Sequence, residues 1–515
     1  MVARGLRFSA LGIEFVIAAL VAGVITLLAI AGVDKLGTIG FVLPLAAVVT
    51  TVLISRPLVA VGLLVGITIL AEGGTFGLFN FTGKLYEQAF KDVTILDLIV
   101  LLAVASVAVD VLRSGRAIWI PRPLALPLLA LMLAMMCGLV VAHAAGVTLH
   151  FAIFAENILA YLLWIPIAVA NLDINRKQIT WLLGILMGLA IFKALLGVIV
   201  VVGHMGASIE GSSTLSYYEP AANWLIMIAL LSVAALALMR LRAKPWIWLG
   251  TPLLLASLVL SYRRSFWIAT ILGLMLLLLL GSTSTTRKAL VPAVLAIIAS
   301  IWLIGSINFQ SQAPVVKRLA TLAPSKLEAN AEDRYRLDER ANVLGNIKEH
   351  PIEGLGIDVP WKATVRPLPI EHEDGREYVH FAALWYWMKL GILGLWAYIM
   401  IIGGAIVLSW QAWRASREPY LRGFALASMC GALGLIAMDT TASFTGVDPR
   451  FTILFAAQLG LLARLKRTAG EQPSDEADSL FSGAAARAVG AAGAGVVPAH
   501  TSSVLRVGPG GGPRG

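Results

Sequence analysis

The sequence predicts an all-α polytopic membrane protein, and three observations support this fold class. Of the 515 residues, 58% are hydrophobic and only 14% are charged, whereas soluble domains contain about 25% charged residues. Apolar stretches of about 17 to 25 residues, long enough for a helix to cross the hydrocarbon core, recur along most of the chain. Every second short loop is rich in Lys and Arg, as loops on the cytoplasmic side are. Together these features predict about 12 to 14 transmembrane helices.

The apolar stretches give the positions of the predicted spans. They lie near residues 10–32, 37–55, 57–71, 93–112, 123–142, 151–170, 179–202, 221–239, 245–262, 265–281, 289–308, 381–409, 423–442 and 450–464. The first stretch is long and lacks a small-residue cleavage site, so we expect it to remain as a span and not to be removed as a signal peptide. The alternation of basic loops then places both termini in the cytoplasm.

This pattern divides the chain into four regions. Residues 1–308 form a transmembrane helix bundle, 309–380 form one long extracytoplasmic loop with amphipathic helices, 381–467 add the C-terminal transmembrane helices, and 468–515 form a tail. The tail is rich in Gly, Ala, Ser and Pro and has too little apolar surface to fold alone, so it is predicted to be disordered and cytoplasmic. A loop as long as 309–380 usually has a function.

The formal net charge of +10 does not predict a nucleic-acid partner. Most Lys and Arg residues lie in short loops, where they set the orientation of the spans. The two cysteines, Cys137 and Cys430, lie in apolar stretches. They are expected to be small buried side chains and not a disulfide or a metal site.

A pair of arginines interrupts one long apolar region. As a single helix, the region between Lys244 and Arg287 would be about 50 Å long, far more than the bilayer core. Both flanks are basic, so the region is predicted to cross twice, with an outer turn at Ser261–Trp267 (SYRRSFW). That turn places Arg263 and Arg264 at the outer surface. Guanidinium groups there either bind an anion such as phosphate, which matches their planar fork, or anchor the turn among lipid headgroups.

Several other charged residues lie inside predicted spans, mostly in the outer halves. They are Glu156, Lys193, Lys389, Asp439 and Arg450. Charges in a membrane are usually paired and often mark a substrate site. These residues therefore either bind substrate or fix helix packing, for example by pairing one of the carboxylates with Lys193 or Arg450. Lys193, the deepest, and Lys389 are candidate substrate-binding residues.

Two further segments carry polar candidates. The outer loop 212–220 is polar and aromatic, and its Tyr217 and Tyr218 are candidates for lining a sugar site, although polar loops are common on any surface. In the long loop, an amphipathic helix after Arg334 is predicted to end near His350, because a proline follows it. Gly354 and the nearby Gly356 predict a tight turn, but no strand precedes them, so they are not a nucleotide-binding fingerprint.

His380 lies where the long loop joins the next span, level with the predicted arginine turn. A histidine there can act as a general base near neutral pH, or it can contact lipid headgroups. His372, Glu373 and Asp374 lie nearby in sequence, but their spacing is not that of a zinc site. We therefore expect neither a metal nor another cofactor.

Three segments together resemble the bacterial O-antigen ligase and O-antigen polymerase superfamily. They are the Ser261–Trp267 turn, then Arg336 followed by His350–Gly356 (HPIEGLG), and then His380–Leu384 followed by Gly391–Leu395 (GILGL). The first is similar to the family's Ser-Arg motif at an outer turn, the second to its arginine, helix and HPxxGxG signature, and the third to the start of its next span. Phe381 replaces the usual Asn after the histidine, and Arg340 stands where the family often has an aromatic residue.

The resemblance implies a metal-independent membrane glycosyltransferase with a GT-C-like fold in the cytoplasmic (inner) membrane. It would take a glycan from undecaprenyl diphosphate on the outer face and pass it to a glycan or glycolipid acceptor. By matching positions, Arg263 or Arg264 would hold the diphosphate together with Arg336. His380 would orient or deprotonate the acceptor hydroxyl. Apart from the family pattern, Arg340 of the long loop is a further candidate substrate-binding residue. Membrane lipid is the other expected partner.

Two other classes of protein remain open on the sequence. A flippase or transporter of lipid-linked glycans would be expected to show inverted repeats and broken helices near the middle of the membrane. The sequence shows no repeat, and its unusual charges gather toward the outer side. A non-catalytic assembly protein of the cell envelope would tolerate the combined loss of the arginines and of His380. Ligase and polymerase are not distinguished by the sequence.

Overall fold

The computed structural model describes residues 48–71, 85, 88–90, 93–149, 157–203, 207–208, 215–216, 219–239, 244–281, 331–368 and 378–470. The chain divides into two compact units, Met1–Ala469 and Gly470–Gly515. Apart from the last residue of the final helix, all described elements belong to the first unit. The predicted spans at 10–32 and 289–308, most of the span at 37–55 and nearly all of the tail lie outside the described residues.

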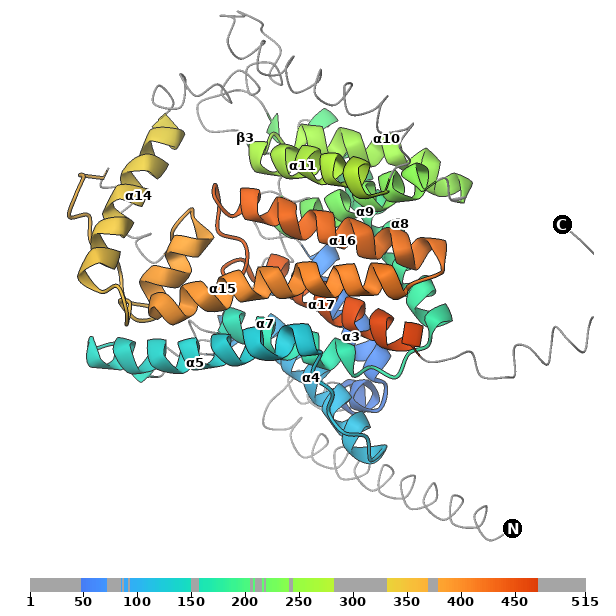
Figure 1. The fold of residues 1–515 in the computed structure, drawn as a ribbon, viewed down its shortest axis with the longest axis horizontal. Helices are drawn as coiled ribbons and strands as arrows, with labels where there is room; N and C mark the ends of the chain where they lie inside the picture. The colour runs from blue at the N-terminus through green and yellow to red at the C-terminus, as the bar shows by residue number, and fades with distance from the viewer. Residues whose placement is uncertain are drawn as a thin grey trace, which may run out of the picture. The chain divides into compact units, whose positions relative to one another are not determined.

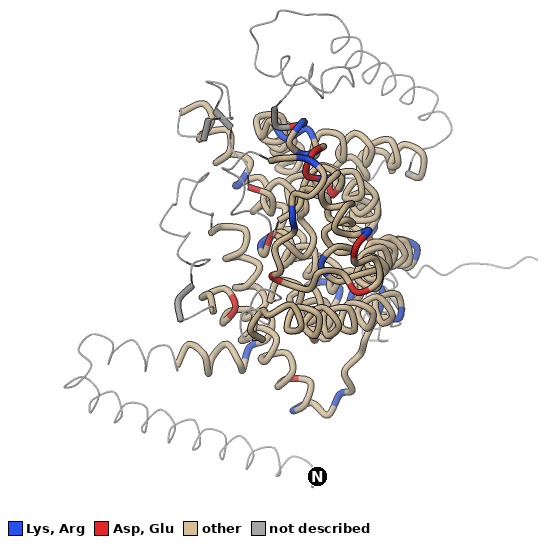
Figure 2. Tube along the Cα trace, turned by 90° about the vertical axis from the view of Figure 1, so that its left-hand side faces the viewer, with Lys and Arg blue, Asp and Glu red and all other residues tan. Residues whose placement is uncertain are grey.

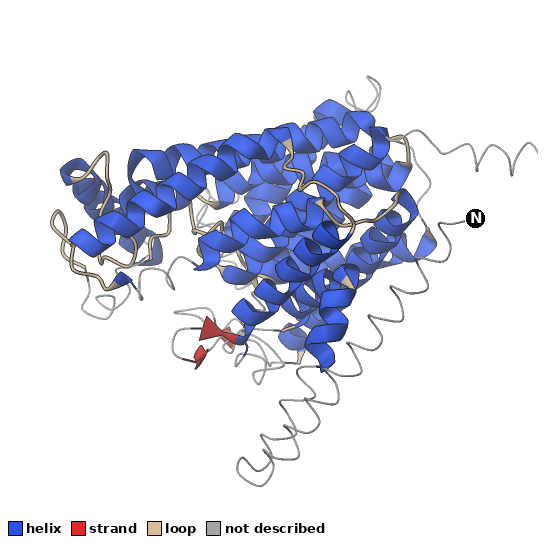
Figure 3. Cartoon of the chain, turned by 90° about the horizontal axis from the view of Figure 1, so that it is seen from below, coloured by secondary structure: helices blue, strands red, loops and turns tan. Residues whose placement is uncertain are grey.

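The described elements are almost all helical (Figure 1; Figure 3). In chain order they are α3 (Pro57–Leu70), β1 (Gln88–Phe90), β2 (Val93–Thr94), α4 (Ile95–Arg113), α5 (Arg122–Ala144), α7 (Asn157–Ala170), α8 (Arg176–Val202), β3 (Ala207–Ser208), β4 (Leu215–Ser216), α9 (Pro220–Leu238), α10 (Pro245–Leu260), α11 (Arg264–Gly281), α14 (Ala331–Glu349), α15 (Ala382–Ala415), α16 (Pro419–Met438) and α17 (Pro449–Gly470). The strands form two small antiparallel pairs, β1 with β2 and β3 with β4.

Six of the described helices, α4, α5, α8, α9, α15 and α16, are long and apolar enough to cross a membrane. A seventh candidate is the pair formed by residues 48–55 and α3, which is bent by 111°, and α7, α10 and α11 are shorter apolar helices. Charged residues are few along these helices (Figure 2). The structure therefore confirms the prediction of an all-α polytopic membrane protein. Each predicted span from 57–71 to 265–281 and from 381–409 onward corresponds to a described helix, although residues 151–156 of the span at 151–170 lie outside the described residues.

Helix α16 lies at the centre of the bundle and packs against α15, α11 and α9. Small residues make these close contacts possible, as is usual between membrane helices. A Cβ added to Gly434 would lie 2.9 Å from the backbone oxygen of Ala269 in α11, and one added to Gly431 would clash with the Ile228 side chain of α9. The sequence of α16 thus specifies which faces meet.

The predicted outer turn is present between α10 and α11. Helix α10 ends at Leu260 and α11 begins at Arg264, and the backbone of Tyr262 adopts a positive φ of 52° between them. The Ser261 hydroxyl accepts a hydrogen bond from the backbone N–H of Arg263 at 3.3 Å. The turn therefore presents two adjacent arginine side chains from the start of α11.

Helix α15 is broken near its N-terminal end, and the HPIEGLG segment crosses the break. Gly391 has φ 67°, a conformation that glycine adopts most easily, and a Cβ there would clash with the backbone oxygen of Ile352. Across the break, Leu355 N–H donates to Met388 O at 2.7 Å, and Ile392 N–H donates to Ile352 O at 3.0 Å. The two motifs are therefore parts of one backbone arrangement, which holds the first part of α15 against the loop.

Candidate active site

The first turn of α14 is tied to the first turn of α11 by an ion pair. Arg264 donates from Nη2 to Asp333 Oδ1 at 2.5 Å and from Nη1 to Asp333 Oδ2 at 3.0 Å. The two side chains are only 10% and 9% exposed. This bidentate geometry is the strongest form of an arginine–carboxylate contact. It places α14 beside the outer turn, and Figure 1 shows α14 next to the N-terminal part of α15.

Helix α14 also positions His380 through Glu339. The buried Glu339 carboxylate accepts the backbone N–H of His380 at 2.9 Å, and both carboxylate oxygens lie 3.1 Å from His380 Nδ1. The Glu339 side chain is 3% exposed and the His380 side chain 27% exposed. A carboxylate on Nδ1 makes that nitrogen the donor, so the lone pair of Nε2 remains available to accept a proton.

Arg263, Arg336 and His380 line one cavity of about 450 Å³. Its other lining residues are Pro220, Tyr378, Ala442, Ser443, Phe444, Val447, Asp448, Pro449 and Arg450. The cavity thus joins the α10–α11 turn, α14, the segment before α15, and the starts of α9 and α17. Three of the four residues predicted to be catalytic meet there, although the first and the last of them are more than a hundred positions apart in the chain.

Among the residues that line the cavity, three arginines outnumber the one carboxylate, Asp448, and we call it the cationic cavity. Arg263, Arg336 and Arg450 all line it, and Arg450 is ion-paired with Glu219 and lies 3.6 Å from Asp448 Oδ2. Helices α9, α11 and α17 also begin at or beside the cavity, so the positive ends of three helix dipoles meet there. Such an arrangement of helix N-termini and guanidinium groups is suited to bind an anion, and a phosphate group in particular.

Hydrogen bonds hold the loop between α16 and α17 as one wall of the cavity. The buried Asp439 side chain accepts from the Tyr398 hydroxyl at 2.9 Å and from Phe444 N–H at 3.2 Å. The Ser443 hydroxyl donates to Val379 O at 2.5 Å. The loop and the residues around His380 are therefore fastened to each other.

Two tyrosines pack edge-on against the His380 ring. The ring of Tyr378 lies 4.8 Å away and that of Tyr335 lies 5.9 Å away, measured between centroids. The pKa of each hydroxyl is raised to about 12, mainly by burial and with a smaller contribution from the nearby Glu339 carboxylate. Both tyrosines therefore remain protonated near neutral pH, which leaves His380 as the better proton acceptor of the three.

The remaining predicted site residues lie elsewhere or are not described. Arg340 is exposed, with its guanidinium 5.2 Å from the centre of the Phe381 ring. Lys193 is buried in α8, and Lys389 is buried and donates to Val359 O, and neither lines the cavity. Tyr217 and Tyr218 lie outside the described residues.

Three residues of this site do not stand out in the sequence as parts of it. Glu339 is one of several charged residues on an amphipathic helix, and its burial against His380 depends on how α14 packs. Glu219 is not singled out by the sequence, and the structure pairs it with Arg450; Glu156, one of the partners that the sequence suggests for Arg450, lies outside the described residues. Tyr378 lies two positions before His380, outside the motif, and has no signal of its own. Among the described residues no group of His, Cys, Asp and Glu has a metal-binding arrangement, and His372 to Asp374 lie outside them.

Arg264→Ala is expected to destabilise the fold by about 3–5 kcal/mol, because it removes the bidentate partner of the buried Asp333 carboxylate. The apparent Tm of the purified protein in detergent measures this. Adding Asp333→Asn to the same chain removes the buried charge and is expected to restore part of the loss. An unchanged Tm together with lost activity would instead place Arg264 among the residues that act on the substrate.

One comparison with known protein families gives a match that overlaps the site. Residues 249–399 match the O-antigen ligase family model. The matched region contains the outer turn, α14 and the first part of α15, and hence Arg263, Arg336 and His380, whereas Pro220 and the wall around Arg450 lie outside it. A search of curated proteins found no match. The match to residues 249–399 supports assignment of this part of the chain to the O-antigen ligase and polymerase family of membrane proteins.

Proposed function

We propose that the protein transfers a glycan from undecaprenyl diphosphate to an acceptor hydroxyl at the outer face of the cytoplasmic membrane. One observation carries the proposal: Arg263, Arg336 and Arg450 line the same cavity as His380, whose Nδ1 is held by Glu339. The arginines supply positive charge for a diphosphate, and the histidine supplies a proton acceptor beside it.

The proposed step is a substitution at the anomeric carbon. The acceptor oxygen forms a bond to this carbon while the bond from the carbon to the diphosphate oxygen breaks. His380 Nε2 takes the proton of the acceptor hydroxyl, and the bonding electrons leave with the undecaprenyl diphosphate. Negative charge develops on the leaving oxygen, so fixed guanidinium groups there lower the barrier.

In this proposal the arginines provide the charge stabilisation that a divalent cation provides in other transferases. The reaction is therefore expected to be independent of added metal. The buried Glu339 keeps His380 in the tautomer that accepts a proton, and Asp439 positions the wall that contains Ser443 and Phe444. Arg264 supports the site through Asp333 and is not expected to contact the diphosphate.

Glycan transfer by purified protein in liposomes tests the function. Undecaprenyl-diphosphate oligosaccharide is the donor, and the reactions are run with and without a chelator and with and without a separate glycolipid acceptor. Lipid-linked chains that lengthen on their own would identify a polymerase, and transfer that needs the separate acceptor would identify a ligase. Movement of the donor across the bilayer without transfer would support the transporter alternative and contradict the proposal.

A further inference from the structure

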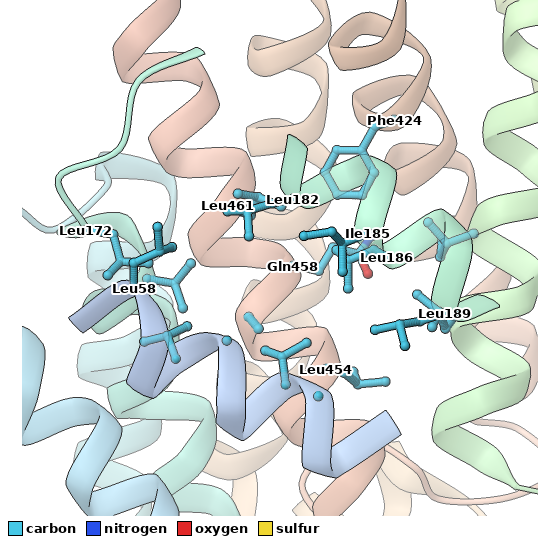
Figure 4. A pocket seen from close by; sticks show the side chains of 18 of the residues that line it. Leu58, Leu172, Leu182, Ile185, Leu186, Leu189, Phe424, Leu454, Gln458 and Leu461 are labelled. Atoms are coloured by element: carbon cyan, nitrogen blue, oxygen red, sulfur yellow. The ribbon is translucent and has the colours of Figure 1, made fainter. Parts of the chain in front are cut away.

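A second cavity lies inside the helix bundle and is apolar. It has a volume of about 280 Å³ and is lined by residues of α3, α7, α8, α9, α16 and α17 and by Leu172, which follows α7 (Figure 4). Its lining is almost entirely aliphatic and aromatic. The Gln458 side chain is the polar exception, and its Oε1 accepts a hydrogen bond from Trp224 Nε1 at 2.9 Å. The cavity is therefore suited to hydrocarbon and not to a sugar or an ion.

The apolar cavity lies one helical turn from the cationic cavity, the one lined by Arg263, Arg336 and Arg450, on two different helices. On α9, Pro220 lines the cationic cavity and Trp224 lines the apolar one. On α17, Arg450 lines the cationic cavity and Leu454 the apolar one. Four residues of helix span about 6 Å and return to nearly the same face. Both cavities therefore face the same side of α9 and α17, one after the other.

A smaller apolar cavity adjoins the larger apolar cavity on the side away from the cationic cavity. It has a volume of about 120 Å³. Both apolar cavities are lined by Leu186, Leu225, Ile228 and Phe424. It continues along α9 to Leu236 and ends beside Lys244 and Tyr420. From Trp224 to Leu236 the path follows α9 for about 18 Å. The two apolar cavities together thus form an elongated space, and we call them the apolar channel.

Glycines leave recesses in the wall of the apolar channel. Gly62 and Gly66 of α3 and Gly184 of α8 line it, and no atom of the described chain lies within 4 Å of a Cβ built on any of them. At the edge of the channel, Gly62 and Ile185 are exposed, which gives a chain access from the side. The open space at these glycines leaves room in the channel wall for the methyl branches of a polyisoprenoid chain.

From this geometry we infer that the apolar channel holds the polyisoprenoid chain of the lipid carrier while its diphosphate lies among the arginines. The inference rests on the proposed function for the identity of the head group. It adds a site for the other part of the same molecule: a chain that runs from a diphosphate in the cationic cavity into the channel would first meet Trp224 and Leu454. Binding of the chain would orient the donor before the acceptor arrives.

Photo-crosslinking tests the channel without requiring glycan transfer. The probe is a sugar-free polyprenyl diphosphate with a diazirine in the isoprenoid chain, added to the full-length protein in lipid nanodiscs, followed by peptide mapping. We expect labels on peptides of α3, α8, α9 and α17 that line the channel, and displacement by unlabelled polyprenyl diphosphate. Labels spread over the lipid-facing surface, or displaced equally well by a phospholipid, would overturn the inference.

Substitution of the glycines provides the matched variants. Gly62→Leu and Gly66→Leu fill the recesses and are expected to lower probe labelling about tenfold and to raise the donor KM by a similar factor, as the lost burial of a few methylene groups would. Their effect on kcat is expected to be small. Gly403→Leu in α15 is the control, because a Cβ built on Gly403 also has no described atom within 4 Å and this residue lies outside the channel.

The outcomes separate this inference from the proposed function. If the channel is labelled and the glycine variants reduce this labelling, but neither the wild-type protein nor any variant transfers glycan, the channel is supported and the proposed transferase function is contradicted. Glycan transfer with an unchanged donor KM in Gly62→Leu and Gly66→Leu, and with labelling elsewhere, would contradict the channel alone. Equal losses in Gly403→Leu would show that the substitutions act through helix packing and would also overturn the inference.

Discussion

Arg336→Ala is expected to lower kcat for glycan transfer by about 100- to 1,000-fold. Arg336 lines the cationic cavity together with Arg263 and His380. If the diphosphate leaves from this cavity, removal of one fixed cation costs about what loss of one oxyanion donor costs in other enzymes. The donor KM is expected to change much less, because the charge on the leaving group develops mainly in the transition state. Single-turnover transfer from a lipid-linked oligosaccharide measures the effect.

Arg340→Ala is the matched control for this substitution. Arg340 lies one turn farther along the same helix, but its side chain is exposed and stacks on Phe381. Its loss removes the same charge from α14 without emptying the cavity, so we expect kcat to fall by less than about threefold. Equal losses of activity in the two variants would mean that the overall charge of the helix matters, and would contradict a specific contact between Arg336 and the leaving group.

Much of this site could be predicted from the sequence because its parts lie where hydropathy changes. The outer turn follows from a rule about length and charge: an apolar region too long for one span, with basic residues on both flanks, must reverse. The end of α14 follows from His350 and the proline after it, and the structure ends the helix at Glu349. His380 is notable in the sequence because it lies at the junction of a loop and a span.

The rest depends on side-chain direction and on contacts between distant segments. Arg263 and Arg264 are equivalent in the sequence, yet one lines the cavity and the other pairs with Asp333. Only the local backbone at the start of α11 distinguishes them. Arg450 reaches the site because α17 begins beside α9, where Glu219 accepts its ion pair. Neither the apolar patterning nor the positive-inside rule contains that information.

Glu339→Gln is expected to lower kcat by about 100- to 1,000-fold, nearly as much as His380→Ala, which removes the proposed base and is expected to cost about 100- to 10,000-fold. The carboxylate accepts both the backbone N–H and the ring Nδ1 of His380. A glutamine has only one oxygen, and the backbone N–H will occupy it. The amide NH₂ then faces Nδ1 and forces the proton onto Nε2, so the ring can no longer accept a proton from the acceptor hydroxyl.

Measuring the Tm as well as kcat shows whether Glu339 positions His380 or only stabilises the fold. Glutamine preserves the volume of Glu339 and one of its hydrogen bonds, so the Tm of Glu339→Gln is expected to stay within a few degrees of the wild-type value. The double variant Glu339→Gln with His380→Ala is expected to be no slower than His380→Ala alone, because the carboxylate acts only through the histidine. Additive losses in the double variant would contradict this role and would show that Glu339 contacts the substrate directly.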